Sequence, residues 1–259
     1  MPKAQTGESK GRGMSRRGVV TSSVLLLSLS APGGHGNAWE ITAHRTITQH
    51  ALEVLPEPLK RVLKTKAGML YYGVVEPDYN RVDDHKLHLS AIRGKMPGLG
   101  GGASFALDRF ARKAEAMIKA EEPVSEIAFV LGQAAHFIQD LNVPLHTIWG
   151  ETREEHETYE RQAYFLGWPG ERYGYRGFYL VKNYKCFAHE TAQRSHPYVS
   201  QALSPVPPSR VIEETWDSAV NDTATLWLST FYRALGPEKS LERYGIPAPN
   251  GVKGKGWFC

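Results

Sequence analysis

The sequence predicts an all-α protein that folds as a single-domain helical bundle. Apolar residues recur at helical spacing along most of the chain after residue 38, whereas the alternation that is typical of strands is nearly absent. Prolines and glycines separate these periodic segments, as expected between helices. The chain of 259 residues is long enough for one domain with a full hydrophobic core, and it contains no internal repeat.

The first 38 residues have the pattern of a cleaved export signal. Basic residues precede an apolar stretch from Val19 to Leu29, which is too short for a membrane span of about 20 residues. Small residues follow, and Gly36-Asn37-Ala38 forms a suitable cleavage site. The letters "SRRGVV" resemble a twin-arginine signal, and an ordinary Sec leader explains them equally well. We therefore expect export to the periplasm or the extracellular space.

Three segments in the N-terminal half are expected to be helical. Residues 42–55 carry apolar side chains at helical spacing before a proline ends the run, and a short helix is expected over 58–66. A glycine-rich connector covers 94–104. Its last residue, Ser104, can cap a helix over 105–120.

The C-terminal half contains the expected central helix and the longest helix. Ser125 can cap the almost entirely apolar segment 126–141, which we expect to be buried. Residues 152–165 are polar but rich in helix formers, and residues 169–186 are expected to form a long loop or a small hairpin. A long helix is expected over 209–235, where a glycine ends it.

These patterns divide the chain into a leader (1–38), a helical domain (39–236) and an irregular C-terminal tail (237–259). No second apolar span follows the leader, so we expect no transmembrane segment after cleavage. The chain has two cysteines, Cys186 and Cys259, which could pair in an oxidising compartment or remain as thiols.

The net charge of +4 comes from the leader. The chain holds 31 basic and 27 acidic residues, and five of the basic and one of the acidic residues lie in the first 38. The formal net charge of the remaining chain is therefore zero. A global basic field of the kind that attracts nucleic acid is excluded.

Two histidine-containing stretches lie within 25 residues of each other, "HFIQDLNVPLH" and "HETYE". Positions four apart share one face of a helix, so His136 faces the same side as Asp140, and His156 the same side as Glu160. A proline then turns the chain, which can bring His146 back to the same centre. Imidazoles with carboxylates suit Zn²⁺, and five such ligands exceed what one tetrahedral ion needs. The alternative is a surface pair and a solvated acidic face, but the apolar neighbours of Asp140 favour a metal.

The complete motif, H-x3-D-x5-H followed by H-x3-E, resembles the zinc-dependent phospholipase C family, typified by the phosphatidylcholine-preferring enzyme that bacilli secrete. Fungal zinc single-strand nucleases belong to the same superfamily. The resemblance extends from Trp39 to about Leu235, and it implies that 39–236 is a catalytic domain around three zinc ions. It implies nine zinc ligands: Trp39, His44, Asp78, His88, His136, Asp140, His146, His156 and Glu160.

Several of these assignments follow from the resemblance alone. Trp39 would bind zinc through its amine and carbonyl oxygen, and it acquires that free amine only when the leader is cleaved. Asp140 would bridge two ions. In "DDHKLHLS" the context "LHLS" favours His88 as the ligand, with His85 as the alternative. Tyr79 would face the choline group of a substrate through a cation–π contact, and an ordinary core or surface position explains this tyrosine equally well.

The resemblance implies an exported, monomeric phospholipase C. It would hydrolyse the glycerol-side phosphodiester bond of phospholipids, at a membrane or micelle surface, with zinc-activated water that Asp78 or Glu160 orients or deprotonates. Glu160 in its motif and the zero net charge favour this lipid substrate. The short spacing from Trp39 to His44 favours the alternative, a single-strand nuclease or 3′-nucleotidase that acts on nucleic acid. A secreted zinc-binding protein without turnover is a second alternative.

Overall fold

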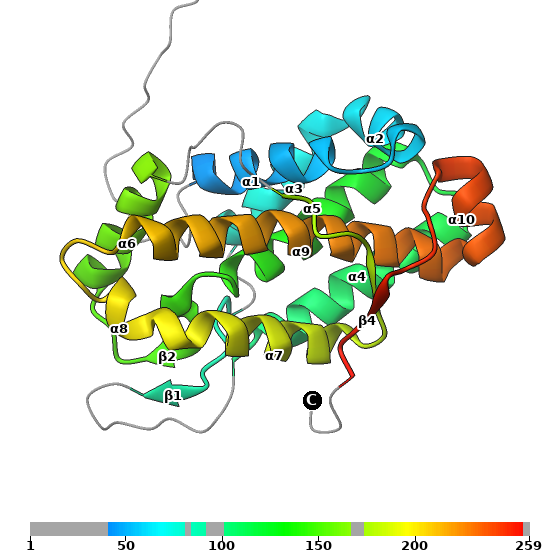
Figure 1. Cartoon of the computed structure of the whole chain (residues 1–259). Coiled ribbons are helices and arrows are strands. Elements are labelled where there is room, and N and C mark those ends of the chain that lie inside the picture. Colours follow the sequence, from blue (N-terminus) through cyan, green and yellow to red (C-terminus); the bar gives the residue numbers. More distant parts are fainter. Residues whose placement is uncertain (1–40, 81–83, 92–100, 167–173, 256–259) are drawn as a thin grey trace, which may run out of the picture. The chain divides into compact units, whose positions relative to one another are not determined.

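The computed structural model describes residues 41–80, 84–91, 101–166 and 174–255, and most of these residues are helical (Figure 1). The all-α prediction is confirmed. The α-helices are α1 (Ile41–Glu53), α2 (Glu57–Lys64), α3 (Ala67–Asn80), α4 (Ala103–Lys119), α5 (Val124–Asp140), α6 (Arg153–Leu166), α7 (Tyr184–Ser195), α8 (Val199–Ala202), α9 (Ser209–Leu235) and α10 (Pro237–Tyr244). The described residues also form short 3-10 helices η1 (Pro144–Thr147) and η2 (His196–Tyr198), and strands β1 (Ser90–Ala91), β2 (Ile148–Trp149), β3 (Tyr179–Val181) and β4 (Gly251–Lys253).

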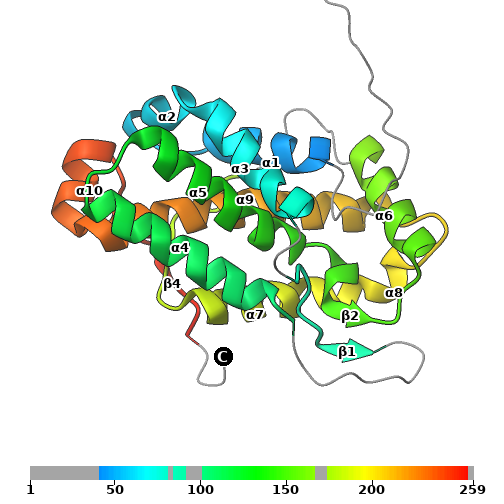
Figure 2. The same ribbon diagram turned by 180° about the vertical axis from the view of Figure 1, so that it is seen from behind.

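Helix α5 is the centre of the bundle. It packs against α3, α4 and α9, and the two opposite views show these helices around it (Figures 1 and 2). From Ile127 to Asp140 every residue except Phe129 is buried. Two of these buried side chains near the C-terminal end of α5, His136 and Asp140, are titratable and need polar partners inside the protein.

Two glycines allow α3 to lie unusually close to α5. A Cβ atom added at Gly73 would lie 2.1 Å from the carbonyl oxygen of Phe129, and one added at Gly132 would lie 2.5 Å from the carbonyl oxygen of Leu70. Any larger side chain at these positions would therefore push the helices apart. The close packing brings the C-terminal end of α3, with Asp78, to the buried face of α5.

Helix α9 supplies much of the remaining core. Its side chains Trp216 and Trp227 are fully buried, and the Trp227 indole donates a hydrogen bond to the carbonyl oxygen of Leu131 on α5 (3.1 Å). The expected bounds of this helix, 209–235, agree with the structure.

Helix α3 was not expected from the sequence. Its fourteen residues include Gly73 and an internal proline, Pro77, which are typical helix breakers, and they show little amphipathic periodicity. Packing against α5 compensates for these poor local preferences. The caps also differ from expectation, because α4 begins at Ala103 and α5 at Val124, so Ser104 and Ser125 lie inside the first turns and make no capping hydrogen bond.

The expectation of an irregular tail over 237–259 is wrong for its described part. Residues 237–244 form α10, and β4 pairs in parallel with β3, with Tyr179 opposite Gly251. The expected loop 169–186 is also shorter, since β3 and the start of α7 lie within it.

Cys186 is buried on α7 and is disulfide-bonded. The second cysteine of the chain, Cys259, lies outside the described residues, as does the leader. None of the helices in the described part of the chain combines the length and the apolar composition that crossing a membrane requires.

Candidate metal centre

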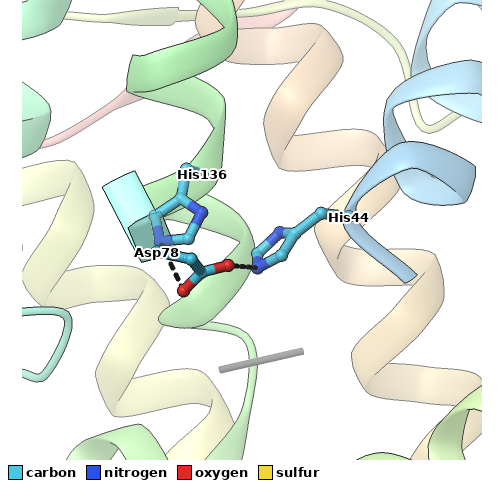
Figure 3. Close-up of side chains that lie close together, drawn as sticks. All are labelled: His44, Asp78 and His136. Carbon is cyan, nitrogen blue, oxygen red and sulfur yellow. Dashed lines mark ion pairs between the residues drawn. The ribbon is translucent and has the colours of Figure 1, made fainter. Parts of the chain in front are cut away.

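Three helices bring His44, Asp78, His136 and Asp140 together. Figure 3 shows the Asp78 carboxylate from α3 between the imidazoles of His136 on α5 and His44 on α1. Asp78 Oδ1 lies 3.9 Å from His136 Nε2, and Asp78 Oδ2 lies 4.0 Å from His44 Nε2. The Asp140 carboxylate lies closer, with Oδ1 3.3 Å from His44 Nε2 and Oδ2 3.1 Å from His136 Nε2. All four residues are buried.

The structure places His85, rather than His88, in this group. The Nδ1 atom of His85 lies 2.9 Å from His136 Nε2, 3.1 Å from Asp140 Oδ2 and 3.6 Å from Asp78 Oδ1. His88 instead packs edge-on against Trp149, with ring centroids 5.2 Å apart, and it belongs to none of the possible metal-binding groups among the described residues. The reason is the extended conformation of this segment, because residues three apart point to opposite sides of an extended chain.

A further group lies between η1 and α6, and it contains His146, His156 and Glu160. His146 Nε2 is 3.2 Å from His156 Nε2, and Glu160 Oε1 is 2.8 Å from His156 Nε2 and 3.8 Å from His146 Nε2. His146 Nδ1 also lies 3.8 Å from Asp140 Oδ2, so the two groups are adjacent. The helical spacing of His156 and Glu160 and the turn before His146 produce this convergence, as the sequence indicated.

Hydrogen bonds fix the orientation of the buried imidazoles. The Nδ1 atom of His136 donates to the carbonyl oxygen of Val74 (2.8 Å), and that of His146 donates to the carbonyl oxygen of His85 (3.2 Å). These oxygens can only accept, so Nδ1 carries the hydrogen. The Nε2 lone pair is then left to face the centre, which is the arrangement of metal-binding histidines.

Gln139 fixes the orientation of the His44 imidazole in the same way, and this role was not predicted from the sequence. Its Oε1 atom accepts from His44 Nδ1 (2.7 Å), while its Nε2 atom donates to the hydroxyl groups of Thr48 and Thr223 at 3.1 Å and 3.3 Å. No local pattern could identify this role, because the partners come from α1 and α9.

Lys86 and Glu151 also join the centre without having been expected. They form an ion pair with each other, and Glu151 Oε1 lies 3.8 Å from His156 Nδ1. The segment that carries His85 is thereby tied to the loop before α6. Glu151 is the first residue of the acidic run "ETREEHETYE". A solvent-exposed helix face would have the same composition, so the sequence does not distinguish Glu151 from its acidic neighbours.

The electrostatics of the metal-free centre are those of a crowded acid–imidazole cluster. Burial lowers the pKa of His44, but the carboxylates of Asp140 and Asp78 outweigh it and raise that pKa to about 9. Burial raises the pKa of Asp140, yet the nearby His136 and His146 hold it well below its ordinary value. For Asp78 burial prevails and its pKa is raised. Protons therefore balance the buried carboxylates in the absence of a cation.

The donor atoms fit zinc. In a tetrahedral zinc site with bonds of about 2.0–2.1 Å, neighbouring ligand atoms lie roughly 3.4 Å apart. In three groups of these residues the donor atoms all lie within 4.8 Å of one another: His44, Asp78 and His136; His85, His136 and Asp140; and His146, His156 and Glu160. His44 Nε2 and both oxygens of Asp140 are buried without a partner at hydrogen-bond geometry. Such atoms are free to coordinate a cation, which could take the place of the protons in balancing the buried carboxylates.

Two sequence-predicted residues lie elsewhere. Trp39 lies outside the described residues, which begin two positions later. Tyr79 follows Asp78 at the end of α3, and 61% of its surface is exposed, so it is available to a molecule that approaches from solvent.

Comparison with known proteins agrees with this geometry. A family model described as zinc dependent phospholipase C matches residues 43–230, a span that includes every described residue of the three groups. The chain belongs to the zinc-dependent phospholipase C family. No curated protein matches the chain.

Solved structures of two clostridial toxins share the fold of this member of the zinc-dependent phospholipase C family. The alpha-toxin of Clostridium perfringens is 17% identical, with a TM-score of 0.54 over 78% of this chain and 65% of the toxin. The alpha toxin of Clostridium absonum is 18% identical, with a TM-score of 0.52 over 74% of this chain and 63% of the toxin. The chain thus covers less than two thirds of the length of either toxin.

Proposed function

We propose that the protein is an exported zinc-dependent phospholipase C that hydrolyses the glycerol-side phosphodiester bond of phospholipids. The observation that carries this proposal is the convergence of three adjacent histidine–carboxylate groups, two of which share His136, in a chain of the zinc-dependent phospholipase C family. The leader with its cleavage site supports export, and the substrate would be met at a membrane or micelle surface.

The proposed site holds three zinc ions. Asp140 would contribute to two of them, because its two oxygens face His44 on one side and His85 with His136 on the other. We assign His85 in place of His88 to the second of these sites, on the distances given above. Trp39, whose amine would be freed by cleavage of the leader, is proposed as a further ligand. When bound, zinc stabilises charge on phosphoryl oxygens and lowers the pKa of water. The proposed ligands are Trp39, His44, Asp78, His85, His136, Asp140, His146, His156 and Glu160.

The protein's own residues orient the reactants. Asp78 and Glu160 are the two carboxylates proposed to align the attacking water and to receive its proton, one in each part of the centre. Gln139 and the backbone carbonyls hold the imidazoles with Nε2 inward. Tyr79, which follows Asp78 and is exposed, is proposed to contact a cationic headgroup through its ring.

The test is hydrolysis by the protein produced with its leader and purified after export. Its N-terminus is read by mass spectrometry, its zinc content is measured, and release of phosphocholine from phosphatidylcholine is assayed in mixed micelles. Release that depends on zinc and disappears in His136→Ala supports the proposal. The matched pair His85→Ala and His88→Ala tests the ligand assignment, since only His85→Ala should lose both zinc and activity.

Absence of phosphocholine release from fully zinc-loaded protein would refute the phosphatidylcholine substrate. Assays with single-stranded DNA and 3′-nucleotides then test the nuclease alternative. A zinc-loaded protein that cleaves neither class, nor lipids with other headgroups, would be the non-catalytic zinc-binding protein.

A further inference from the structure

Two of the assigned ligands lie on short segments outside the long helices. His85 opens an extended segment that ends in β1, and His146 lies in η1, directly before β2. Backbone hydrogen bonds join the segments, from Leu87 N to His146 O (2.9 Å) and from Leu89 N to Thr147 O (2.8 Å), and β1 pairs with β2. The spacing of the two histidines depends on this pairing, together with the hydrogen bond from His146 Nδ1 to the carbonyl oxygen of His85.

His196 bridges the side chains of the same two segments. Its Nδ1 atom lies 2.8 Å from Thr147 Oγ1, and its Nε2 atom lies 3.2 Å from Ser90 Oγ. Thr147 Oγ1 donates its own hydrogen to the carbonyl oxygen of Pro144 (2.6 Å), so it can only accept from His196. Nδ1 of His196 therefore carries the ring hydrogen, and Nε2 accepts from the hydroxyl of Ser90. One imidazole in one tautomer holds both segments.

The residue before His196 fixes the other end of the segment that contains His146. Ser195 Oγ donates to the carbonyl oxygen of Leu141 (2.7 Å), one residue after Asp140. The corner between α7 and η2 thus contacts the chain just after Asp140 and again just after His146. The stretch between these two ligands is anchored at both ends by consecutive residues.

We infer that His196 is a positioning residue of the metal centre, which sets the separation of His85 and His146. It is not among the ligands and acts through Thr147 and Ser90. The inference rests on the proposed function in one respect, namely that zinc binds at these histidines. Loss of an outer partner of a metal ligand lowers metal affinity or activity by about 10–100-fold.

The experiment measures the zinc affinity of the exported protein by competition with a chromogenic chelator. The visible spectrum of the cobalt(II)-substituted protein and the unfolding midpoint of the metal-free protein are recorded alongside it. We expect His196→Ala to lower the affinity about 10–100-fold and to change the cobalt(II) spectrum. The matched control is His189→Ala. His189 is also partly buried but lies on α7, and the variant should keep the wild-type zinc affinity.

Two further variants separate positioning from general stability. The amide nitrogen of asparagine is as many bonds from Cα as Nδ1 of histidine, so His196→Asn can still donate to Thr147 and should recover most of the affinity. Thr147→Val keeps the shape of the buried side chain but removes the hydrogen bond with His196, together with the one to the carbonyl oxygen of Pro144. It should reproduce the loss of zinc affinity even where His196→Ala does not fold.

Equal zinc affinities of His196→Ala and His189→Ala, or of Thr147→Val and wild type, would overturn the inference, whatever the unfolding midpoints. Wild-type protein that binds zinc but cleaves no phosphodiester would refute the proposed function. The inference about His196 would then be judged by the zinc affinities alone. Wild-type protein that binds no zinc would overturn both.

Discussion

The carboxylate of Asp222 on α9 is a buried charge that the structure balances with two cations. It is 1% exposed. One oxygen accepts hydrogen bonds from Arg194, Asn142 and Thr191, and the other accepts from Lys253 Nζ at 2.9 Å. Since Lys253 lies in β4, this cluster joins the C-terminal strand to the middle of α9.

We predict that Asp222→Asn destabilises the protein by about 3 kcal/mol at pH 7. Removing one partner of a buried ion pair typically costs about 3–5 kcal/mol, because the other charge is left without compensation. Here the side chains of Arg194 and Lys253 are 38% and 26% exposed, so water can solvate them after the substitution. The lower end of the range therefore applies, and it is still a large part of the roughly 5–15 kcal/mol of a typical domain.

The same cluster predicts a pH dependence with a definite sign. Burial raises the pKa of Asp222, but Arg194 and Lys253 outweigh it and lower the pKa below its ordinary value. The carboxylate therefore contributes its full stabilisation above the unfolded-state pKa of about 3.9, and the contribution is lost as the pH falls through the folded-state pKa. Asparagine does not titrate, so the stability difference between wild type and Asp222→Asn should shrink in acid.

Urea unfolding of both proteins between pH 7 and pH 3, metal-free in a chelator, measures this difference. Asp217→Asn on the same helix is the control: burial raises the pKa of Asp217 despite its ion pair with Arg176, so no narrowing in acid is expected there. A difference for Asp222→Asn that stays constant from pH 7 to pH 3, or that is below about 1 kcal/mol at pH 7, would refute the reasoning.

The remaining predictions concern the outer contacts of the centre and the helix packing that places it. Gln139→Leu removes the acceptor from His44 and should lower zinc affinity about 10–100-fold in a chelator competition, whereas Gln133→Leu, on the same helix but hydrogen-bonded to Glu76 rather than to a ligand, should not. Gly73→Ala places a Cβ 2.1 Å from a backbone oxygen of α5 and should cost about 1–3 kcal/mol or more in thermal unfolding. Gly68→Ala, where nothing lies within 4 Å, is its control and should be neutral or slightly stabilising; equal losses at both glycines would contradict the packing argument.

The sequence predicted the helices whose burial is regular. The segments 126–141 and 209–235 were predicted because both helices are buried along most of their length, so that apolar residues recur throughout them. Helix α3 was missed because its stability comes from one close contact with α5, and that contact requires Gly73, a residue that disfavours helices in isolation. Residues 237–244 were missed for a different reason, because they were grouped with the Gly- and Pro-rich remainder of the tail, although Pro237 in the first turn and Gly245 at the C-terminal cap are usual at helix ends.

The ligands of the candidate metal centre likewise fall into those that the sequence predicts and those that it does not. His136 with Asp140, and His156 with Glu160, are four residues apart on helices, so a sequence specifies that they share a face. His85 and His88 lie on an extended segment, and which of them faces inward depends on how that segment pairs with residues about 60 positions later.

The difference between helical and non-helical ligands also explains which ligands need other side chains to hold them in place. A helix holds two ligands four residues apart through its own backbone hydrogen bonds, so His136 and Asp140 keep their spacing without help from another element. His85 and His146 lie outside such helices, and their spacing depends on the hydrogen bond from His146 Nδ1 to the carbonyl oxygen of His85 and on short strands that would be marginal alone. The side chain that bridges these strands, His196, therefore acts on the ligands whose positions local sequence leaves undetermined. Lys86, next to His85 in the same extended segment, adds a further tie through its ion pair with Glu151.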